Sequence, residues 1–464
     1  MREQQRDGAV TRRGFLKAAS GSVLASALVP AVVAPAVAAA VASPATAPLP
    51  ATPRRPAAKR RYAIVGTGIR GSTMWSASAL ARHGDAIELV GLCDVNRKRV
   101  ELVKRRLGAS CPTFTDFEAL LKEARPELLA VTTVDATHSG YIVRALDAGL
   151  DVITEKPMVT DETQCRAVLE AEKRSGRRLT VGFNYRFAKK HQRIKEVLLS
   201  GAIGKVTSVD FNWYLDIHHG ADYFRRWHRL RGSSGSLLVH KSTHHFDLMN
   251  WWLAAAPVEV FAHGGLKVYG RNGPFRHAQC RGCPHAAKCP FFWDITKDRG
   301  LAELYVECES EDGYKRDGCV FREDVDIFDT MNVSVRYSND VTMSYSLNAA
   351  MPFEGYRLAF NGSEGRLEIR DHDRQPWTPD RPTEIWLTRN FGKREAIDVE
   401  AVSGGHGGGD ELLLAQVFAK PELPEWLALP GVRDGALSCL TGIAARKSID
   451  ERRLVRIEEL VPGL

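Results

Sequence analysis

The sequence predicts two domains of different class: an α/β domain built on a parallel sheet, followed by an α+β domain rich in antiparallel strands. Between residues 61 and 183, short apolar runs alternate with segments of helical periodicity, which is typical of a parallel sheet covered by helices. A glycine-rich turn directly follows the first of these runs. After residue 200 the pattern changes to apolar–polar alternation with short turns, which favours antiparallel pairing.

The composition is ordinary for a globular protein, and 464 residues suffice for two hydrophobic cores. The formal net charge of +8 comes largely from the N-terminus, because residues 1–58 hold seven of the 64 Lys and Arg but only two of the 56 Asp and Glu. The remaining 57 basic and 54 acidic residues form no basic block with interleaved aromatics. Nucleic acid is therefore not an expected partner.

Residues 1–42 resemble an export signal of the twin-arginine type. Arg12 and Arg13 precede an uncharged run rich in Ala and Val, with small residues before the expected cleavage site. A retained membrane anchor is the alternative, but Ala, Gly, Ser and Pro in the run gain little from lipid. Residues 43–58, rich in Pro, Ala and Thr, predict a flexible linker. We expect a periplasmic or extracellular protein, carried by the twin-arginine export machinery and without a stable membrane span after cleavage.

The glycine-rich turn predicts a dinucleotide site. An apolar run, Tyr62–Val65, is followed by a Gly-x-Gly-x-x-Gly segment from Gly66 to Gly71 and by an amphipathic stretch to about His83. In this arrangement the first glycine allows a tight turn, the second lets the backbone approach a pyrophosphate, and the third lets helix and strand pack closely. The helix N-terminus faces the phosphate charge. We therefore expect a Rossmann NAD-binding domain over residues 59–183; a ligand-free turn is the alternative.

The next predicted strand, Ile87–Cys93, indicates which cofactor is bound. It ends at Asp94, which is placed to accept hydrogen bonds from the ribose hydroxyls and to repel a 2′-phosphate. This favours NAD, with NADP as the alternative because Arg97 lies close enough to weaken the preference.

Three more predicted strands bring polar residues to the same edge of the sheet: residues 128–134, 151–154 and 179–183. Ligands of parallel sheets collect outside the carboxyl ends of the strands, so the residues that follow them should face one crevice. The predicted cofactor contacts are Gly66, Thr67, Gly68, Ile69, Arg70, Gly71, Asp94, Thr132, His138, Glu155 and Lys156.

These motifs resemble the Gfo/Idh/MocA family, named after glucose–fructose oxidoreductase and inositol dehydrogenase. The most specific motif is Glu155-Lys156-Pro157 after a predicted strand. The resemblance extends through Gly182–Arg186 and His244–Asp247 to a late predicted helix over residues 435–449, and so covers nearly all of the mature chain.

The resemblance implies that residues 184–430 form a C-terminal α/β domain with a large, open, mostly antiparallel sheet backed by helices. In this family the flat face of the sheet often forms oligomer contacts, so a homo-oligomer is expected. Residues 431–464 are expected to pack a helix and tail back on the first domain. The apolar–polar alternation of the sequence agrees with this fold in outline. A predicted helix over 189–200 is followed by predicted strands, for example at 207–214, 258–268, 331–337, 342–347, 356–361 and 366–369.

Hydride transfer from a secondary alcohol needs a base for the hydroxyl proton, and the reverse reaction needs an acid. The resemblance assigns this proton handling and substrate positioning to Lys156 and His244. A lysine pKa near neutrality requires desolvation or a cationic neighbour, and both are plausible at the mouth of a buried site.

The second-domain motif departs from the family pattern, which puts an Asp four residues before the catalytic His. His240 stands there instead, and this puts the usual acid/base arrangement in doubt. His240 could contact substrate, could be a packed and hydrogen-bonded histidine, or could share a metal with His244. Two histidines four apart lie on one face of a helix, but spacing fixes no third ligand. The predicted substrate contacts are Tyr185, Arg186, His240, Lys241, Asp247, Arg226 and His406.

A cysteine-rich insertion over residues 270–320 interrupts the second domain. Cys280, Cys283 and Cys289 are followed by Cys308 and Cys319, a spacing that fits a structural zinc or an iron–sulfur cluster. Disulfides formed after export are the rival, and free thiols the third alternative.

The resemblance thus implies an oxidoreductase acting with NAD on a carbohydrate or cyclic polyol. Outside the cytoplasm there is no NAD pool to exchange with, so we expect a tightly bound cofactor and redox-neutral chemistry. The alternatives are an NAD-dependent glycoside hydrolase, which oxidises the sugar transiently, and a non-catalytic sugar- or cofactor-binding protein.

Overall fold

The computed structural model describes residues 58–400, 402 and 404–464. The predicted export signal and all but the last residue of the predicted linker lie outside this range. Within it, no helix combines the length and the apolar character that crossing a membrane requires.

The first sheet has six strands, all parallel, in the order β3-β2-β1-β4-β5-β6. The chain builds outward from β1 in one direction and then resumes at β4 on the other side, which creates a switch point between β1 and β4 where ligands bind in such sheets. β4 and β6 are wholly buried, because helices cover both faces. The strands are β1 (Arg60–Val65), β2 (Ile87–Cys93), β3 (Thr113–Phe114), β4 (Leu128–Val131), β5 (Asp151–Thr154) and β6 (Leu179–Val181).

The helices of this domain begin at the carboxyl ends of its strands. The helical stretch after the glycine turn contains a π-helical segment, Thr73–Ser78, between α1 and α2. Side chains of Asn96 and Asp161 accept hydrogen bonds from backbone amides in the first turns of α3 and α6 and so cap them. The helices are α1 (Ile69–Ser72), α2 (Ala79–His83), α3 (Arg97–Leu107), α4 (Phe117–Ala119), α5 (His138–Asp147) and α6 (Glu162–Ser175).

The second sheet has nine strands in the order β14-β13-β12-β11-β7-β10-β9-β8-β15. Only β7 and β10 pair in parallel among them; the other pairs are antiparallel. Buried and more exposed residues alternate along β9, so one face of the sheet is apolar. The strands are β7 (Val206–Asp216), β8 (Pro257–Gly265), β9 (Thr330–Tyr337), β10 (Thr342–Met351), β11 (Glu354–Gly362), β12 (Gly365–Arg374), β13 (Thr383–Arg389), β14 (Arg394–Ile397) and β15 (Val455–Arg456).

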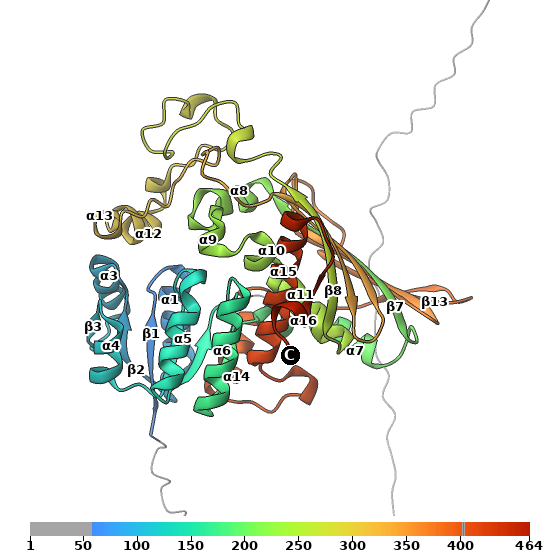
Figure 1. Cartoon of the computed structure of the whole chain (residues 1–464), viewed down its shortest axis with the longest axis horizontal. Coiled ribbons are helices and arrows are strands. Elements are labelled where there is room, and N and C mark those ends of the chain that lie inside the picture. Colours follow the sequence, from blue (N-terminus) through green and yellow to red (C-terminus); the bar gives the residue numbers. More distant parts are fainter. Residues whose placement is uncertain (1–57, 401, 403) are drawn as a thin grey trace, which may run out of the picture. The chain divides into compact units, whose positions relative to one another are not determined.

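Helices of the C-terminal half cover the apolar face of this sheet, with α11, α15 and α16 among them (Figure 1). α15 also contacts α6 and β6, where Gly435 lies against Met158 and Val181. It therefore packs between the two sheets. The helices are α7 (Lys189–Leu199), α8 (Ile217–Arg225), α9 (Arg231–Ser234), α10 (Leu237–His240), α11 (Ser242–Leu253), α12 (Arg299–Leu301), α13 (Glu309–Asp312), α14 (Gly409–Phe418), α15 (Val432–Glu451) and α16 (Ile457–Leu460).

The predicted fold class is confirmed, with differences of detail, among them the short strands β3 and β15, which were not predicted. The strand expected over 128–134 ends at Val131, and the hydroxyl of Thr132 donates to the carbonyl of Gly66 in the glycine turn. β13 and β14 were not predicted, since they lie at the edge of the sheet and expose much of their length.

Candidate functional site

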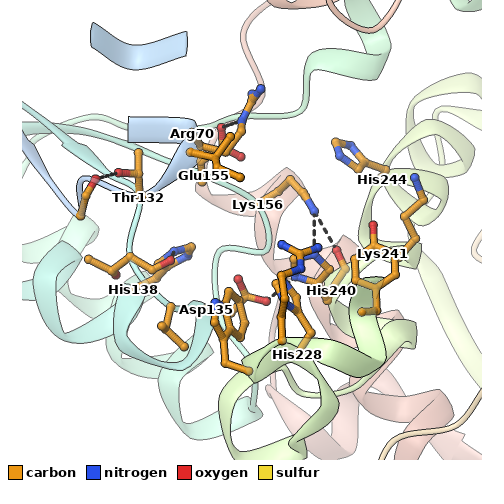
Figure 2. Close-up of a pocket in the computed structure, with 18 of the residues that line it drawn as sticks. Arg70, Thr132, Asp135, His138, Glu155, Lys156, His228, His240, Lys241 and His244 are labelled. Carbon is orange, nitrogen blue, oxygen red and sulfur yellow. Dashed lines mark hydrogen bonds and ion pairs between the residues drawn. The ribbon is translucent and has the colours of Figure 1, made fainter. Parts of the chain in front are cut away.

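A cavity of about 770 Å³ opens at the carboxyl ends of β1 and β4 and extends to the second sheet. Its wall includes Gly66 and Gly68 of the glycine turn and Trp213 of β7. Figure 2 shows Lys156 pointing into this space, with Glu155 on one side and His244 on the other. The volume of the cavity lies within the range typical of cofactor and substrate pockets.

The glycine turn is shaped for close approach by a ligand. Gly66 has a φ of +91°, and a Cβ there would lie 2.7 Å from the Thr132 carbonyl, so only glycine fits. A Cβ on Gly71 would overlap the carbonyl oxygen of Gly66. At Gly68, by contrast, the nearest atom to a Cβ would be the Tyr305 hydroxyl, 3.5 Å away. Gly68 therefore faces the cavity, as the approach of a pyrophosphate requires.

Asp94 holds the glycine turn in place. Its Oδ2 accepts hydrogen bonds from the amide (2.7 Å) and hydroxyl (2.8 Å) of Thr67, while its Oδ1 accepts from the amide of Asn96 (2.9 Å). Thr67 is fully buried and, like Gly71, does not line the cavity, so these two predicted cofactor contacts shape the turn instead. Asp94 itself lines the cavity.

Glu155 anchors the segment that carries Lys156. It accepts hydrogen bonds from Arg70 Nε (2.7 Å) and from the indole of Trp75 (2.8 Å). Burial alone would raise the pKa of Glu155, but the Arg70 guanidinium and the Trp75 hydrogen bond hold it below the ordinary value. Glu155 is therefore a buried carboxylate that fixes the chain next to Lys156.

Lys156 has the chemistry of a proton-transfer group. Its Nζ donates to the carbonyl oxygen of His240 at 3.1 Å and lies 3.4 Å from His240 Nε2. Burial lowers the pKa of Lys156 to about 8, and the carboxylates of Asp135 and Glu155 oppose this shift. An amine with a pKa near neutrality can both accept and donate a proton during turnover.

His240 connects Lys156 to a carboxylate from the other domain. Its Nδ1 lies 2.5 Å from Oδ2 of Asp135, which follows β4. Burial raises the pKa of Asp135 and lowers the pKa of His240 well below its ordinary value. When the proton of the hydrogen bond between Asp135 and His240 lies on His240 Nδ1, His240 Nε2 is an acceptor that faces the Lys156 amine. His240 thus lines the cavity and is hydrogen-bonded within it.

His244 lies beside Lys156 and lines the same cavity (Figure 2). Its ring stacks on Tyr185 with centroids 4.1 Å apart, and Lys241 donates to the Tyr185 hydroxyl at 3.1 Å. Burial lowers the pKa of His244 well below its ordinary value, so it is neutral. Among the described residues nothing bonds its Nδ1. A buried polar atom of this kind is suited to a ligand.

His406 and Arg226 also line the cavity, as predicted for substrate contacts. His406 Nδ1 lies 3.0 Å from Nδ2 of Asn184 and 3.0 Å from Oδ2 of Asp410. Asp410 lies in the first turn of α14, which begins at Gly409, and its carboxylate bonds Asn184 and Arg70.

Two predicted substrate contacts are not in the cavity. Arg186 and Asp247 form a buried, two-pronged ion pair with N–O distances of 2.8 and 2.5 Å, and Arg186 also bonds Asp434 at the start of α15. Because each charge is neutralised by the other away from the cavity, we assign them a structural role that joins three segments of the chain.

The described part of the cysteine-rich insertion contains neither the metal site nor the disulfides that the sequence analysis considered. All nine cysteines of the chain are free thiols. Within residues 58–400, 402 and 404–464, no three or more His, Cys, Asp or Glu side chains are grouped so as to hold a metal, so the zinc or iron–sulfur prediction for Cys280, Cys283 and Cys289 has no support. For the same reason, the alternative that His240 and His244 share a metal has no support among the described residues. The Sγ of Cys280 instead accepts a hydrogen bond from Arg225 (3.1 Å).

Several cavity residues were not predicted. Asp135 could have been found, because it follows a parallel strand between Thr132 and His138. Among the others, some come from segments whose place over the cavity depends on tertiary folding: Tyr305, Asp312 and Tyr314 of the insertion, and Lys190, Trp213, His219, Glu354 and Asp373 around the second sheet.

Comparison with known proteins agrees with this geometry. The model of the oxidoreductase family with an NAD-binding Rossmann fold matches residues 60–183, and the model of the C-terminal alpha/beta domain of that family matches residues 195–457. YteT of Bacillus subtilis, which is named as an oxidoreductase, is 38% identical over 423 residues, 86% of this chain and 98% of YteT. The myo-inositol 2-dehydrogenase of Thermotoga maritima is 23% identical over 403 residues, 86% of this chain and 99% of that protein.

A solved structure shares the fold. The WlbA dehydrogenase from Bordetella pertussis, in complex with NADH and UDP-GlcNAcA, superposes with a TM-score of 0.60 at 18% identity, over 86% of this chain and 99% of that chain. The two family models and the extended match to YteT show that the chain belongs to the Gfo/Idh/MocA family and is an NAD(P)-dependent oxidoreductase.

Proposed function

We propose that the enzyme transfers a hydride to or from a secondary hydroxyl carbon of a sugar or cyclic polyol. The observation that carries this proposal is the Lys156 amine, which lies inside the cavity between the glycine turn and the second sheet. Its pKa of about 8 and its contact with His240 suit it to move the hydroxyl proton.

Lys156, His240 and Asp135 have separable roles in the proposed proton transfer. The nicotinamide cofactor, when bound, accepts or supplies the hydride. During oxidation the neutral Lys156 amine takes the proton from the substrate hydroxyl as the C–H bond breaks, and in reduction the ammonium returns it. His240 positions the amine through Nε2, and Asp135 fixes the tautomer of His240 through Nδ1.

The far end of the cavity suits a polyhydroxylated ring. Trp213 and Tyr223 offer aromatic faces, and Lys241, His219 and Glu354 offer donors and acceptors. Sugar-binding sites need both, because a pyranose or cyclitol ring has apolar C–H faces and a rim of hydroxyls. The names of the curated relatives that are inositol dehydrogenases support a cyclic polyol or sugar as the substrate class.

NAD is the proposed cofactor, with NADP the weaker candidate. Asp94 and Asp312 both line the cavity, and Arg99 between them is already paired with each, at 3.4 and 2.9 Å. Among Asp94, Asp312 and Arg99, a 2′-phosphate would therefore meet two carboxylates and no cation that lacks an acidic partner.

The N-terminal sequence supports export by the twin-arginine route, and export favours a retained cofactor. An exported enzyme has no NAD pool with which to exchange. We therefore infer that oxidation of one substrate is balanced by reduction of another on the same cofactor.

Purified full-length protein tests the proposal. Its absorbance should show bound nicotinamide cofactor, and a panel of sugars and polyols should change the NADH signal on mixing. An empty protein that takes up no cofactor would overturn the proposal. If chromogenic glycosides are cleaved without added NAD, the enzyme is instead a redox-neutral glycosidase, and binding without turnover would indicate a non-catalytic protein.

A further inference from the structure

The cysteine-rich insertion returns from the second domain to the first and lies along α3. Figure 1 shows α12 and α13 beside that helix. We call residues 299–316 the strap. At its start, the guanidinium of Arg106 donates to the carbonyl of Gly300 (3.0 Å) and to the carboxylate of Glu303 (2.7 Å).

The strap is bonded to α3 at its other end as well. Arg99 Nη2 donates to Asp312 at 2.9 Å, and the side chain of Asn96 donates to the carbonyl of Cys308 at 2.8 Å. The Asn96 bond is buried, so it is sheltered from competing water. These contacts span the strap and hold it to the rim of the glycine-turn end of the cavity.

Tyr305 is the part of the strap that reaches the glycine turn. Its hydroxyl accepts a hydrogen bond from the amide of Ile69 at 3.3 Å. Two guanidinium groups lie near the centroid of its ring, that of Arg99 of the first domain at 5.5 Å and that of Arg316 at the end of the strap at 5.6 Å. Tyr305 is buried yet lines the cavity. The Tyr305 hydroxyl is also the nearest atom, at 3.5 Å, to the position that a Cβ on Gly68 would take, so Tyr305 lies next to Gly68 in the cavity wall.

The strap is also fixed to the substrate side of the cavity. Arg316 pairs with Asp222 at 2.9 Å, and Asp222 pairs with Arg226 at 2.8 Å. Arg226 lines the cavity. The strap is thus bonded to both domains beside the cavity.

We propose that the strap is an additional part of the cofactor site, one that closes over the nucleotide and retains it through repeated turnovers. This inference rests on the proposed function of the cavity. The amide of Ile69 belongs to the turn that binds pyrophosphate in this fold, and the Tyr305 hydroxyl beside it can donate to a phosphate oxygen. Release of the nucleotide requires the strap to leave α3, so its ion pairs break first. Slow dissociation follows from this requirement.

The rate at which bound NADH dissociates tests the proposal directly. Full-length protein loaded with NADH would be mixed with excess NAD, and the loss of bound NADH fluorescence would give the dissociation rate. Glu303→Gln and Asp312→Asn remove two partly exposed anchors of the strap and should each speed release about tenfold. Tyr305→Phe keeps the packed ring and removes only the hydroxyl, so its NADH dissociation rate tests the part played by the contact of that hydroxyl with the Ile69 amide.

The matched control is Glu323→Gln, which removes an exposed carboxylate that pairs with Arg276 outside the strap. This variant should release NADH at the wild-type rate. Equal rates in wild type, Glu303→Gln and Asp312→Asn would overturn the strap proposal while leaving the cofactor site intact. Failure of wild type to bind NADH at all would overturn the proposed function and the strap together, so the two failures are distinguishable.

Discussion

His240 Nδ1 lies 2.5 Å from Asp135 Oδ2, although 105 residues separate the two along the chain. Where the family pattern has an Asp four residues before the catalytic His, this chain has an imidazole in the second domain with a carboxylate from the first domain behind it. The two together place an acceptor, His240 Nε2, beside the Lys156 amine. The departure from the family pattern is thus accompanied by a carboxylate that sequence spacing did not indicate.

Asp135→Asn should lower turnover by about 100-fold or more, because the amide can donate to His240 and so favour the wrong tautomer. Cofactor affinity should stay at the wild-type value, since Asp135 acts on the proton-transfer side. Steady-state rates with NADH titrations measure both quantities. The double variant Asp135→Asn with His240→Asp, which puts a carboxylate at the family position, should recover part of the lost turnover. No difference between single and double variants would show that the pair does not act as a unit.

Lys156 should impose a pH dependence of opposite sign on the two reaction directions. Its pKa is lowered to about 8, so the neutral amine needed for oxidation is populated above that pH and the ammonium needed for reduction below it. The oxidation rate should rise and the reduction rate should fall as pH increases through about 8. Lys156→Met should abolish this dependence together with turnover while retaining cofactor. A pH profile that survives in Lys156→Met would assign the proton transfer to another group.

Replacement of Asp94 should weaken discrimination between NAD and NADP. Asp94→Ser removes the carboxylate that lines the nucleotide end of the cavity, and loss of one charged hydrogen-bonding partner should weaken NAD binding by about tenfold or more. NADP binding should weaken less, because its 2′-phosphate no longer meets that charge. Thr67→Val is the control, since it removes only the 2.8 Å hydroxyl contact to Asp94. The ratio of NAD to NADP affinity should change in Asp94→Ser alone.

Arg186 should matter for stability rather than for substrate binding. Arg186→Ala leaves Asp247 buried without its partner, which should cost about 3–5 kcal/mol of unfolding free energy. The exposed pair Arg174–Asp147, at 2.7 Å, is the control, and Arg174→Ala should leave the unfolding free energy close to the wild-type value, because solvent screens an exposed ion pair. Denaturant unfolding measures both variants. If Arg186→Ala unfolds like wild type but raises KM, the residue belongs to the substrate site after all.

The sequence by itself determined the first domain and the position of its active edge. Strand period, the glycine turn and Asp94 are local features, because each depends on neighbours within a few residues. The same holds for Lys156, whose place after β5 follows from the rule that parallel strands present their carboxyl ends together.

Only the tertiary structure decided which polar residues meet. Arg186 and Asp247 looked like site residues but neutralise each other in the interior, whereas Asp135 joined His240 from another domain. Tyr305 reached the glycine turn from an insertion 236 residues away along the chain. Burial, charge pairing and hydrogen bonding between distant segments depend on three-dimensional packing, and no spacing along the chain encodes them.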